Sequence, residues 1–460
     1  MSASAQSLRQ DAVRIWNAGV QAVRSEHLIE QNVSWTSIGL NIADVECTLA
    51  AGARIEVIGA GKAGAGMAAG LLQALQKSPD RLTQHPIDGW VNVPADCVRP
   101  LDRIHLHAAR PAGLNEPTEA GVAGTGEILK RVERRSSNDL CIALISGGGS
   151  ALLPAPAPPV TLSDKQQITR FLAAQGATIQ ELNTVRSQLS LVKGGNLARR
   201  CNAGTLVTLI ISDVIGDPLE YIASGPTVLS DPDPRAAAQI LLRYDSARKN
   251  IPPSAFELLE ARTQQSAAQS SAPSATIVNR IVGSNRVALQ AAAVEARAAG
   301  FEVIDLGSEN SGDAAEHGRA LASRLQRLRN EVTAPTCVLA GGETTVQLTT
   351  EGINDSEPGK GGRNQEVVLA AIDCLPASTH WTGICLLSGG TDGEDGPTDA
   401  AGALADAELV AAAADQQLNS SEFLQRHDSW HFFASIDGLL RTGPTHTNVM
   451  DLVVGLVWPG

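Results

Sequence analysis

The sequence has no hydrophobic run long enough to cross a membrane and no cysteine pair at the spacing of a metal site. Apolar stretches such as residues 140–145 and 206–211 have the length of a strand, far below the ~20 residues of a membrane-spanning helix. Residues 1–16 contain no apolar core of the kind that signal peptides carry. The seven cysteines are an odd number and widely scattered, which suits free thiols in a reducing compartment. These absences predict a cytoplasmic protein without a membrane partner.

The chain also lacks any cluster of lysine and arginine residues. Its 49 acidic residues outnumber its 36 basic residues and give a formal charge of −13. Such a protein has no field that would attract nucleic acids or anionic membrane surfaces, so both classes of partner are disfavoured. The 43% of hydrophobic residues suffice for packed cores, and 460 residues at ~100–200 per domain predict two or three domains. The oligomeric state is left open, and a homodimer is compatible with the sequence.

Strand-like and helix-like patterns alternate along the chain after an opening helix expected over residues 8–33. Alternation of apolar strands with helices predicts an α/β fold in which each sheet is mostly parallel and flanked by helices. The expected strands are residues 54–59, 89–94, 103–108, 140–146, 205–212, 275–283, 301–307, 336–342, 383–390 and 451–457. Helices are expected between most of them, including residues 163–175, residues 178–191 and a group near 404–427.

A polar, low-complexity stretch at residues 263–275 interrupts this alternation. It has no periodic apolar pattern and is typical of a linker or an exposed loop. We therefore expect two domains, a Rossmann-like α/β domain over residues 1–265 and a second α/β domain over residues 266–460. Whether the last strand, residues 451–457, returns to the first domain is left open.

Glycine is abundant, and many glycines lie where strands end. The 43 glycines exceed the ~32 expected at an average usage of ~7%. Five predicted strands end in glycine-rich or acidic turns, at residues 59–62, 146–150, 212–213, 341–344 and 388–396. Ligands bind beyond the carboxyl ends of the strands in an open parallel sheet. A glycine that merely ends a strand is the alternative for any single turn, but five such turns together favour a ligand-binding cleft.

The first of these turns includes Gly61 and Lys62 and matches the pattern G-x-G-x-x-G over residues 59–64. The dinucleotide-binding version of this pattern needs an acidic residue at the end of the next strand, where Asp96 is imperfectly placed. A lysine at a helix N-terminus favours phosphate or carboxylate binding instead. A solvated surface lysine is the alternative interpretation.

The second turn offers three unhindered amides and two hydroxyls, from Ser146, Gly147, Gly148, Gly149 and Ser150. Such a turn can form an anion-binding nest. It is not a Walker A loop, since no G-x-x-x-x-G-K-[ST] sequence occurs in the chain. Ser150 is a weak nucleophile candidate because no base adjoins it. Asp213, after another apolar strand, suits three roles: a cap, a metal ligand or a general base.

The C-terminal part of the chain carries the remaining polar candidates. Arg363 opens a helix and suits a forked grip on phosphate or carboxylate, whereas Asn364 is a candidate N-cap. Asp392, Asp395 and Asp399 lie close together in one loop, which fits either Mg²⁺ bound together with phosphate oxygens or a solvated acidic turn. The sequence Thr445-His446-Thr447-Asn448 precedes the last strand and is expected to line the same cleft.

Eight motifs, taken in order, resemble the glycerate 2-kinase family, whose C-terminal region is called the MOFRL domain. They are VIGAGKAGAGMA (57–68), ISGGGSALLPAP (145–156), LNTVRSQLSLVKGG (182–195), ISDVIGDPLEYIASGPT (211–227), AGGETTVQL (340–348), GKGGRNQE (359–366), LSGGTDGEDGPTDAAGA (387–403) and GPTHTNVMD (443–451). The resemblance covers nearly the whole chain. One departure is Arg110-Pro111, where family members often have His-Pro.

The resemblance implies a kinase that uses ATP and Mg²⁺ to phosphorylate D-glycerate at its 2-hydroxyl, with the active site between two α/β domains. The family's catalytic residues correspond to Lys62, Asp213 and Arg363. We expect Asp213 to accept the hydroxyl proton, the two cations to neutralise phosphoryl and carboxylate charge, and Asp392 or Asp395 to bind Mg²⁺. The residues expected to bind substrate or phosphate are Gly61, Ser146, Gly147, Gly148, Gly149, Ser150, Glu343, Thr344, Asn364, Thr445 and Asn448.

Two other functions compete with this hypothesis. An NAD(P)H-dependent hydroxypyruvate reductase would use the glycine pattern at residues 59–64, but Lys62 within the loop and the missing ribose carboxylate disfavour it. A non-catalytic sugar- or nucleotide-binding protein on the same fold is the second alternative. The joint presence of Lys62, Asp213 and Arg363 argues against it.

Overall fold

The computed structural model describes residues 4–231, 233–265, 273–348 and 359–460. The chain forms two compact units, which we call the central unit (residues 25–282) and the terminal unit (residues 1–24 together with 283–460). The sequence placed the boundary at residue 265 and assigned the first helix to the N-terminal domain. In the structure the units divide after Val282, and the first helix belongs with the C-terminal part of the chain.

The central unit is built on a six-stranded sheet. Its strands are β4 (Ile55–Ala60), β5 (Ile87–Pro94), β6 (Ile104–Arg110), β7 (Leu140–Ser146), β8 (Thr205–Ile211) and β9 (Thr276–Gly283), in the order β6-β5-β4-β7-β8-β9. The first five strands run parallel. All residues of β4 and β7 are buried, as expected for strands covered on both faces. The strand order reverses between β4 and β7, and open parallel sheets bind ligands at such a point.

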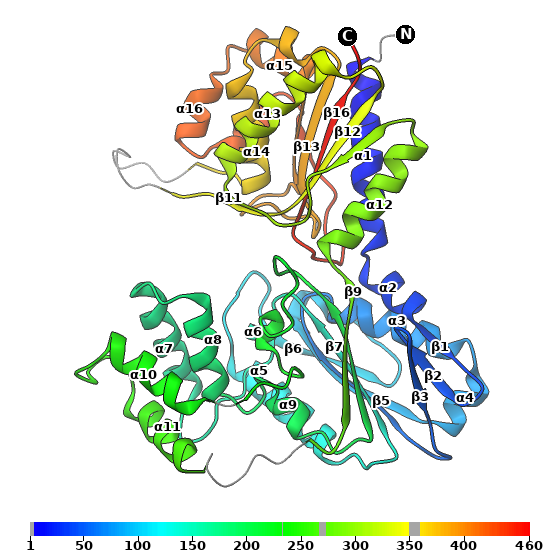
Figure 1. Ribbon diagram of the computed structural model, residues 1–460, viewed down its shortest axis with the longest axis vertical. Helices are drawn as coiled ribbons and strands as arrows, with labels where there is room; N and C mark the ends of the chain where they lie inside the picture. Colours follow the sequence, from blue (N-terminus) through cyan, green and yellow to red (C-terminus); the bar gives the residue numbers. More distant parts are fainter. Residues whose placement is uncertain (1–3, 232, 266–272, 349–358) are drawn as a thin grey trace. The chain divides into compact units, whose positions relative to one another are not determined.

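Helices and a small second sheet complete the central unit (Figure 1). The small antiparallel sheet consists of β1 (Val33–Trp35), β2 (Gly39–Ile42) and β3 (Val45–Thr48). The helices are α2 (Ser25–Asn32), α3 (Gly64–Gln76), α4 (Pro79–Gln84), α5 (Glu119–Glu133), α6 (Gly149–Leu152), α7 (Leu162–Ala174), α8 (Ile179–Gln188), α9 (Asn196–Arg199), α10 (Pro234–Tyr244) and α11 (Pro253–Gln265). Helices α7, α8, α10 and α11 share an apolar core of their own. Capping boxes at Thr161 and Thr178 begin α7 and α8.

The terminal unit contains a mixed sheet. Its strands are β10 (Glu302–Asp305), β11 (Asn310–Asp313), β12 (Thr336–Thr345), β13 (Ile384–Gly390), β14 (Gly402–Asp406), β15 (Leu439–Leu440) and β16 (Asp451–Val457). The order is β10-β12-β16-β13-β14-β15, and β11 pairs with β12. The last strand, β16, runs antiparallel to both β12 and β13. The two-domain α/β class is confirmed, but this sheet is mixed rather than mostly parallel. The strand β16 lies antiparallel between β12 and β13, and β14 and β15 add two more antiparallel pairs.

Helices cover both faces of this sheet (Figure 1). They are α1 (Ala5–Ala22), α12 (Asn285–Ala298), α13 (Ala314–Glu331), α14 (Arg363–Cys374), α15 (Ala407–Asp415), α16 (Ser420–Gln425) and α17 (Ser429–Ser435). Helices α1 and α12 pack side by side on one face, and α13 and α14 pack together on the other. No described helix is long and apolar enough to cross a membrane. All seven cysteines are free thiols.

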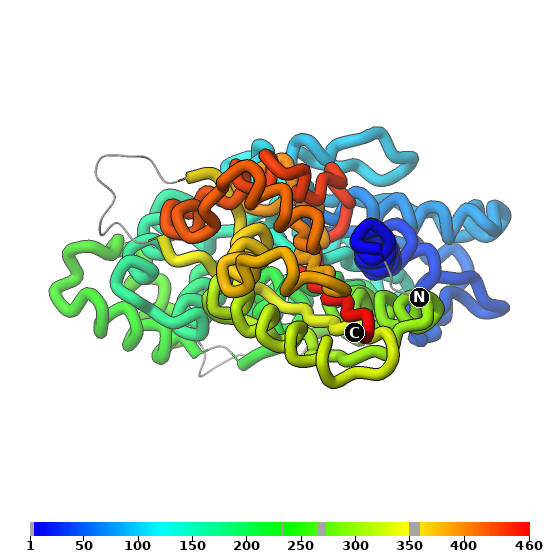
Figure 2. Tube along the Cα trace, turned by 90° about the horizontal axis from the view of Figure 1, so that it is seen from above, coloured from blue at the N-terminus to red at the C-terminus, as the bar shows by residue number. Residues whose placement is uncertain are grey.

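The first helix is anchored by apolar side chains, which explains its place in the terminal unit. Ile15, Trp16 and Val20 are buried, and the Trp16 indole donates a hydrogen bond of 3.3 Å to the carbonyl of Gly389 in β13. Figure 2 shows α1, in dark blue, beside the light green α12. The expected helix over residues 8–33 is in fact two helices, α1 and α2. The break falls at the boundary between the units.

Three expectations differ from the structure in detail. The segment from residue 33 to 48 contains the small antiparallel sheet, whose strands of three and four residues are too short to give a periodic signal. The group of helices expected from residue 404 is preceded by β14, which ends at Asp406. The expected linker at residues 263–275 begins inside α11, and residues 266–272 lie outside the described residues.

Replacing Trp16 by Ala is expected to destabilise the terminal unit by about 3–5 kcal/mol, because it removes a fully buried aromatic side chain. Hydrogen exchange would show faster exchange in β13 and β16 and unchanged exchange in β4 and β7. The exposed neighbour Asn17, replaced by Ala, is the control. Faster exchange in β4 rather than β16 would place α1 in the central unit.

Candidate functional site

Two turns are bound to each other where the strand order of the central sheet reverses. Gly61 follows β4 with a φ of +150°, and a Cβ at this position would collide with the Ser146 hydroxyl at the end of β7. The Ser146 Oγ accepts a hydrogen bond of 3.0 Å from the amide of Ala63. The amide of Lys62 donates a 2.9 Å bond to the carbonyl of Gly147. The backbone around Lys62 is therefore fixed by the neighbouring strand.

The turn after β7 brings together side chains from distant parts of the chain. A Cβ at Gly147 would overlap with the carboxylate of Asp213, so this carboxylate lies directly against the turn. At Gly148, whose φ is +74°, a Cβ would lie 3.3 Å from the Lys62 Cγ and 3.4 Å from Arg110 Nη2. The structure thus places Lys62 and Asp213 around one glycine turn, together with Arg110. The expected convergence of strand ends accounts for this arrangement.

A cavity of about 490 Å³ opens beside the turn, within the size range of small-molecule sites. Its lining includes Gly148, Gly149, Ser150 and Asp213, all candidates from the sequence. It also includes four basic residues that the sequence did not single out as candidates, Lys165, Arg170, Arg186 and Lys193. Arg186 and Lys193 lie inside one of the eight family motifs, but neither stood out individually. The sequence signal that could have identified these residues is the presence of basic residues next to apolar ones within α7, α8 and the loop that follows α8.

Ser150 is the meeting point of two of these cations. The Lys193 ammonium donates to the Ser150 Oγ at 2.5 Å and to the Ser150 carbonyl at 3.2 Å. Arg186 also donates to the Ser150 Oγ. The Nζ of Lys165, in a side chain only 8% exposed, has no hydrogen-bond partner among the described residues. Burial, together with the positive charges of Arg186 and Arg262, lowers the pKa of Lys165 to about 7.

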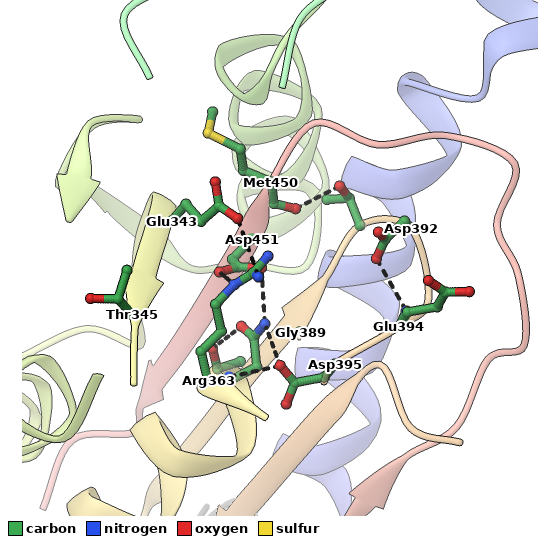
Figure 3. A network of polar contacts seen from close by, with 12 residues as sticks. Glu343, Thr345, Arg363, Gly389, Asp392, Glu394, Asp395, Met450 and Asp451 are labelled. Carbon is green, nitrogen blue, oxygen red and sulfur yellow. Dashed lines mark hydrogen bonds and ion pairs between the residues drawn. The ribbon is translucent and has the colours of Figure 1, made fainter. Parts of the chain in front are cut away.

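The terminal unit holds Arg363 in a network of carboxylates (Figure 3). Its guanidinium forms a forked pair with Asp451, with Nε–Oδ2 at 2.6 Å and Nη2–Oδ1 at 2.9 Å. Nη1 lies 3.2 Å from the Glu343 carboxylate. Burial alone would lower the pKa of Arg363, but the hydrogen bonds to Asp451 and the surrounding negative charge raise it. Arg363 is consequently a fixed cation at the start of α14.

Asp395 caps the N-terminus of α14, so its carboxylate oxygens are already engaged within the protein. Its two carboxylate oxygens accept bonds of 3.0 and 2.9 Å from the amides of Asn364 and Gln365, in the first turn of α14. Burial raises the pKa of Asp395 to about 6 despite these bonds. Asp392 accepts a 3.1 Å bond from the amide of Glu394.

These contacts bear on the expected Mg²⁺ ligands. No group of three His, Cys, Asp or Glu side chains suited to a metal occurs within the described ranges. Asp395, 1% exposed with both oxygens engaged, fits Mg²⁺ poorly. Asp392 is half-buried and remains a candidate ligand.

The other candidates of the terminal unit lie near the same strand ends. Asn364 donates to Asp451 at 2.9 Å and accepts from the Ser388 hydroxyl at 2.6 Å, so it links β13, α14 and β16. Thr344 is buried in β12. Thr445 donates to the carbonyl of Thr391 at 2.5 Å, and Asn448 accepts from the amide of Met450 at 3.1 Å. The candidates therefore form two clusters, one in each unit.

Comparisons with known proteins cover nearly the whole chain. The model of a domain of unknown function, DUF4147, matches residues 11–260, and the MOFRL family model matches residues 336–451. A glycerate kinase of Rattus norvegicus is 35% identical over 98% of this chain and 93% of its own length. A putative hydroxypyruvate reductase of Agrobacterium vitis is 40% identical over 87% and 86% of the two chains. A solved glycerate kinase of Thermotoga maritima, 29% identical, has a TM-score of 0.82 and covers 98% of this chain and 100% of its own.

Replacing Lys165 by Met is expected to remove part of the pH dependence of stability. Because the pKa of Lys165 falls from 10.5 to about 7 on folding, the unfolded chain holds more protons than the folded protein between these values. The free energy of unfolding should then rise with pH in this window, by about 1 kcal/mol per unit. Urea denaturation at pH 7.5 and 8.5 should show a smaller rise for Lys165→Met.

The exposed Lys249, replaced by Met, is the control for this experiment and should retain the rise of the parent protein. An equal rise in all three proteins would show that Lys165 keeps its proton in the folded state.

Proposed function

The chain belongs to the glycerate kinase family, and from this premise we propose that it transfers the γ-phosphoryl group of ATP to the 2-hydroxyl of D-glycerate. The products would be 2-phosphoglycerate and ADP. The observation that carries the proposal is the position of Lys62 and Asp213 around the turn after β7, where the order of the parallel strands reverses.

Asp213 is the proposed general base. Its carboxylate lies against Gly147 and lines the cavity of the central unit, where a small hydroxy acid has room to bind. Asp213 would orient the 2-hydroxyl and accept its proton as the bond to phosphorus forms. Transfer of a phosphoryl group requires little covalent participation by the protein, so correct placement of the hydroxyl is the main task of this residue.

Lys62 and Arg363 are the proposed neutralising cations. Lys62 has an exposed side chain on a backbone that its amide's hydrogen bond to Gly147 holds in place beside the glycine turn. Arg363 is held by Asp451 and is preorganised for a planar contact with phosphate or carboxylate oxygens. Lys62 and Asp213 belong to the central unit, and Arg363 belongs to the terminal unit.

ATP and Mg²⁺ complete the proposal as the nucleotide substrate and its counter-ion. Mg²⁺ usually takes most of its ligands from phosphate oxygens and water, with one or two protein carboxylates. When bound, it would neutralise charge on the transferred group. Of the two aspartates expected from the sequence, Asp392 is the better candidate, since Asp395 caps α14. The cytoplasmic location also stays a prediction, and the seven free thiols are compatible with it.

The reductase alternative has weaker support in the central unit, despite the name of the Agrobacterium relative. An NAD(P)H site of this type needs a carboxylate at the end of the second strand. Here β5 ends near Asn92, whose amide group donates a 2.8 Å bond to the carbonyl of Leu152 inside the core. Asp96 lies beyond the strand in a short 3-10 helix.

A paired assay tests the function directly. One sample contains D-glycerate, ATP and Mg²⁺, with enolase to detect 2-phosphoglycerate, and the other contains hydroxypyruvate with NADH or NADPH. Enolase-detectable product without added mutase would support transfer to the 2-hydroxyl. ADP formation without that product would contradict the regiochemistry, and nicotinamide oxidation without ADP would support the reductase.

Asp213→Asn is expected to lower the turnover number by ~10²-fold or more while ATP binding stays intact, because the neutral amide cannot accept the hydroxyl proton. Steady-state kinetics and a nucleotide-binding titration would measure the two effects separately. The exposed Asp231, replaced by Asn, serves as the control. Unchanged turnover in Asp213→Asn would remove this residue from the mechanism.

Gly147→Ala is expected to reduce turnover by about tenfold or more, because the added methyl group must displace the Asp213 carboxylate. Gly126 in α5 has open space around its Cα and provides a matched Gly→Ala control with unchanged activity. Thermal unfolding of both variants would confirm that they fold. Full activity in folded Gly147→Ala would mean that the position of Asp213 against this turn is unimportant.

A further inference from the structure

The cavity of the central unit collects positive charge that the central-unit contacts leave uncompensated. Lys165 and Lys193 are 8% and 2% exposed, and Arg186 is half-buried. Arg186 and Lys193 donate to neutral oxygen atoms, on Ser150, Ser224 and Asn183. The ammonium of Lys165 has no hydrogen-bond partner among the described residues. We call Lys165, Arg186 and Lys193 the basic cluster.

Burying such a cluster is unfavourable unless an anion accompanies it. The cations repel one another, and burial together with this repulsion lowers the pKa of both lysines. Two acidic side chains also line the cavity. One is Glu116, whose carboxylate is paired at 2.6 Å with Arg170, and the other is Asp213 against the glycine turn. The cluster is therefore suited to an anionic group of a ligand.

We propose that the basic cluster binds the carboxylate of the hydroxy acid substrate and thereby presents its 2-hydroxyl to Asp213. This inference rests on the proposed function. In a 2-hydroxy acid the hydroxyl is on the carbon next to the carboxylate, so a hydroxyl hydrogen-bonded to Asp213 places the carboxylate in the same cavity. Arg186 supplies a planar fork for two oxygens, and Lys193, tied to Ser150, supplies a second donor.

A consequence is that the site selects acids rather than polyols. Glycerol keeps the two hydroxyls of glycerate but has a third hydroxyl group in place of the carboxylate, so it would leave the buried cations uncompensated. Lactate keeps both the carboxylate and the 2-hydroxyl. Lactate should therefore bind, whereas glycerol should not.

The test is equilibrium binding to the full-length protein by isothermal titration calorimetry, with D-glycerate, lactate, glycerol, inorganic phosphate and ADP as separate probes. Arg186→Met should weaken the binding of D-glycerate and of lactate by about 30-fold or more, and should leave the affinity for ADP within about twofold of the parent protein. Arg243, an exposed arginine on α10 paired with Glu181, provides the matched control Arg243→Met with unchanged binding. Glycerol should bind to neither protein.

Arg186→Lys provides a second variant that keeps the charge and loses the fork. Its loss of D-glycerate affinity should be smaller than that of Arg186→Met. Because removing one of several neighbouring cations relieves repulsion, Arg186→Met should not lower the unfolding temperature. This expectation separates a ligand-binding role from a structural one.

A proton readout adds an independent check. Lys165 faces Arg186 and Arg262, and the same cavity is lined by Arg170, Lys193, Glu116 and Asp213. A bound carboxylate would raise the pKa of Lys165 again, so titrations at pH 8 in buffers of different ionisation enthalpy should show proton uptake. Lys165→Met should reduce that uptake.

The outcomes distinguish this inference from the proposed function. If D-glycerate binds and is phosphorylated but Arg186→Met leaves its affinity unchanged, the inference is wrong and the kinase function stands. If Arg186→Met weakens the binding of ADP and phosphate but not that of D-glycerate, the basic cluster binds the nucleotide, and the inference is likewise wrong. If the parent protein neither binds nor phosphorylates D-glycerate, the proposed function fails, and the inference fails with it.

Discussion

The central unit depends on the close contact between the turns that follow β4 and β7. Gly61 leaves room for the Ser146 hydroxyl, and this hydroxyl accepts the amide of Ala63. The contact holds two neighbouring strand ends together at the point where the sheet changes direction. The backbone of Lys62 and the turn beneath Asp213 are both fixed by it. A larger residue at position 61 would therefore disturb the whole candidate site rather than one contact.

The two candidate clusters, one in each unit, treat buried charge in opposite ways. In the terminal unit Arg363 is paired with Asp451, and Asp395 accepts the free amides of α14, so each charge has a partner within the protein. In the basic cluster of the central unit, Lys165 and Lys193 are deeply buried but contact neutral atoms or none. Complete pairing gives a rigid support, whereas incomplete pairing leaves electrostatic energy that a ligand can recover. The paired charges around Arg363 hold its side chain in position, whereas the basic cluster favours the binding of an anion.

Much of the fold could be predicted because apolar strands ending in glycine or aspartate give a strong local signal. The bounds of β7 and β16 agree with the sequence prediction, and the convergence of Lys62 and Asp213 follows from parallel strands ending at one edge. The direction of β16 and the partners of α1 depend on contacts with residues far along the chain, which no local pattern contains. Lys165 and Arg186 were missed for a similar reason, since their burial arises only when α7 and α8 pack together.

The placement of α1 makes the central unit an insertion within the terminal one. All strands of the central sheet come from one continuous segment, so it can be completed while the chain is still being synthesised. Trp16 and its apolar neighbours are synthesised before β13 and β16, so they cannot pack against these strands until most of the chain has been made. The order in which the two units finish folding is thus the reverse of the order in which their first residues appear. Until β16 has been synthesised, the nascent chain exposes the apolar face of α1.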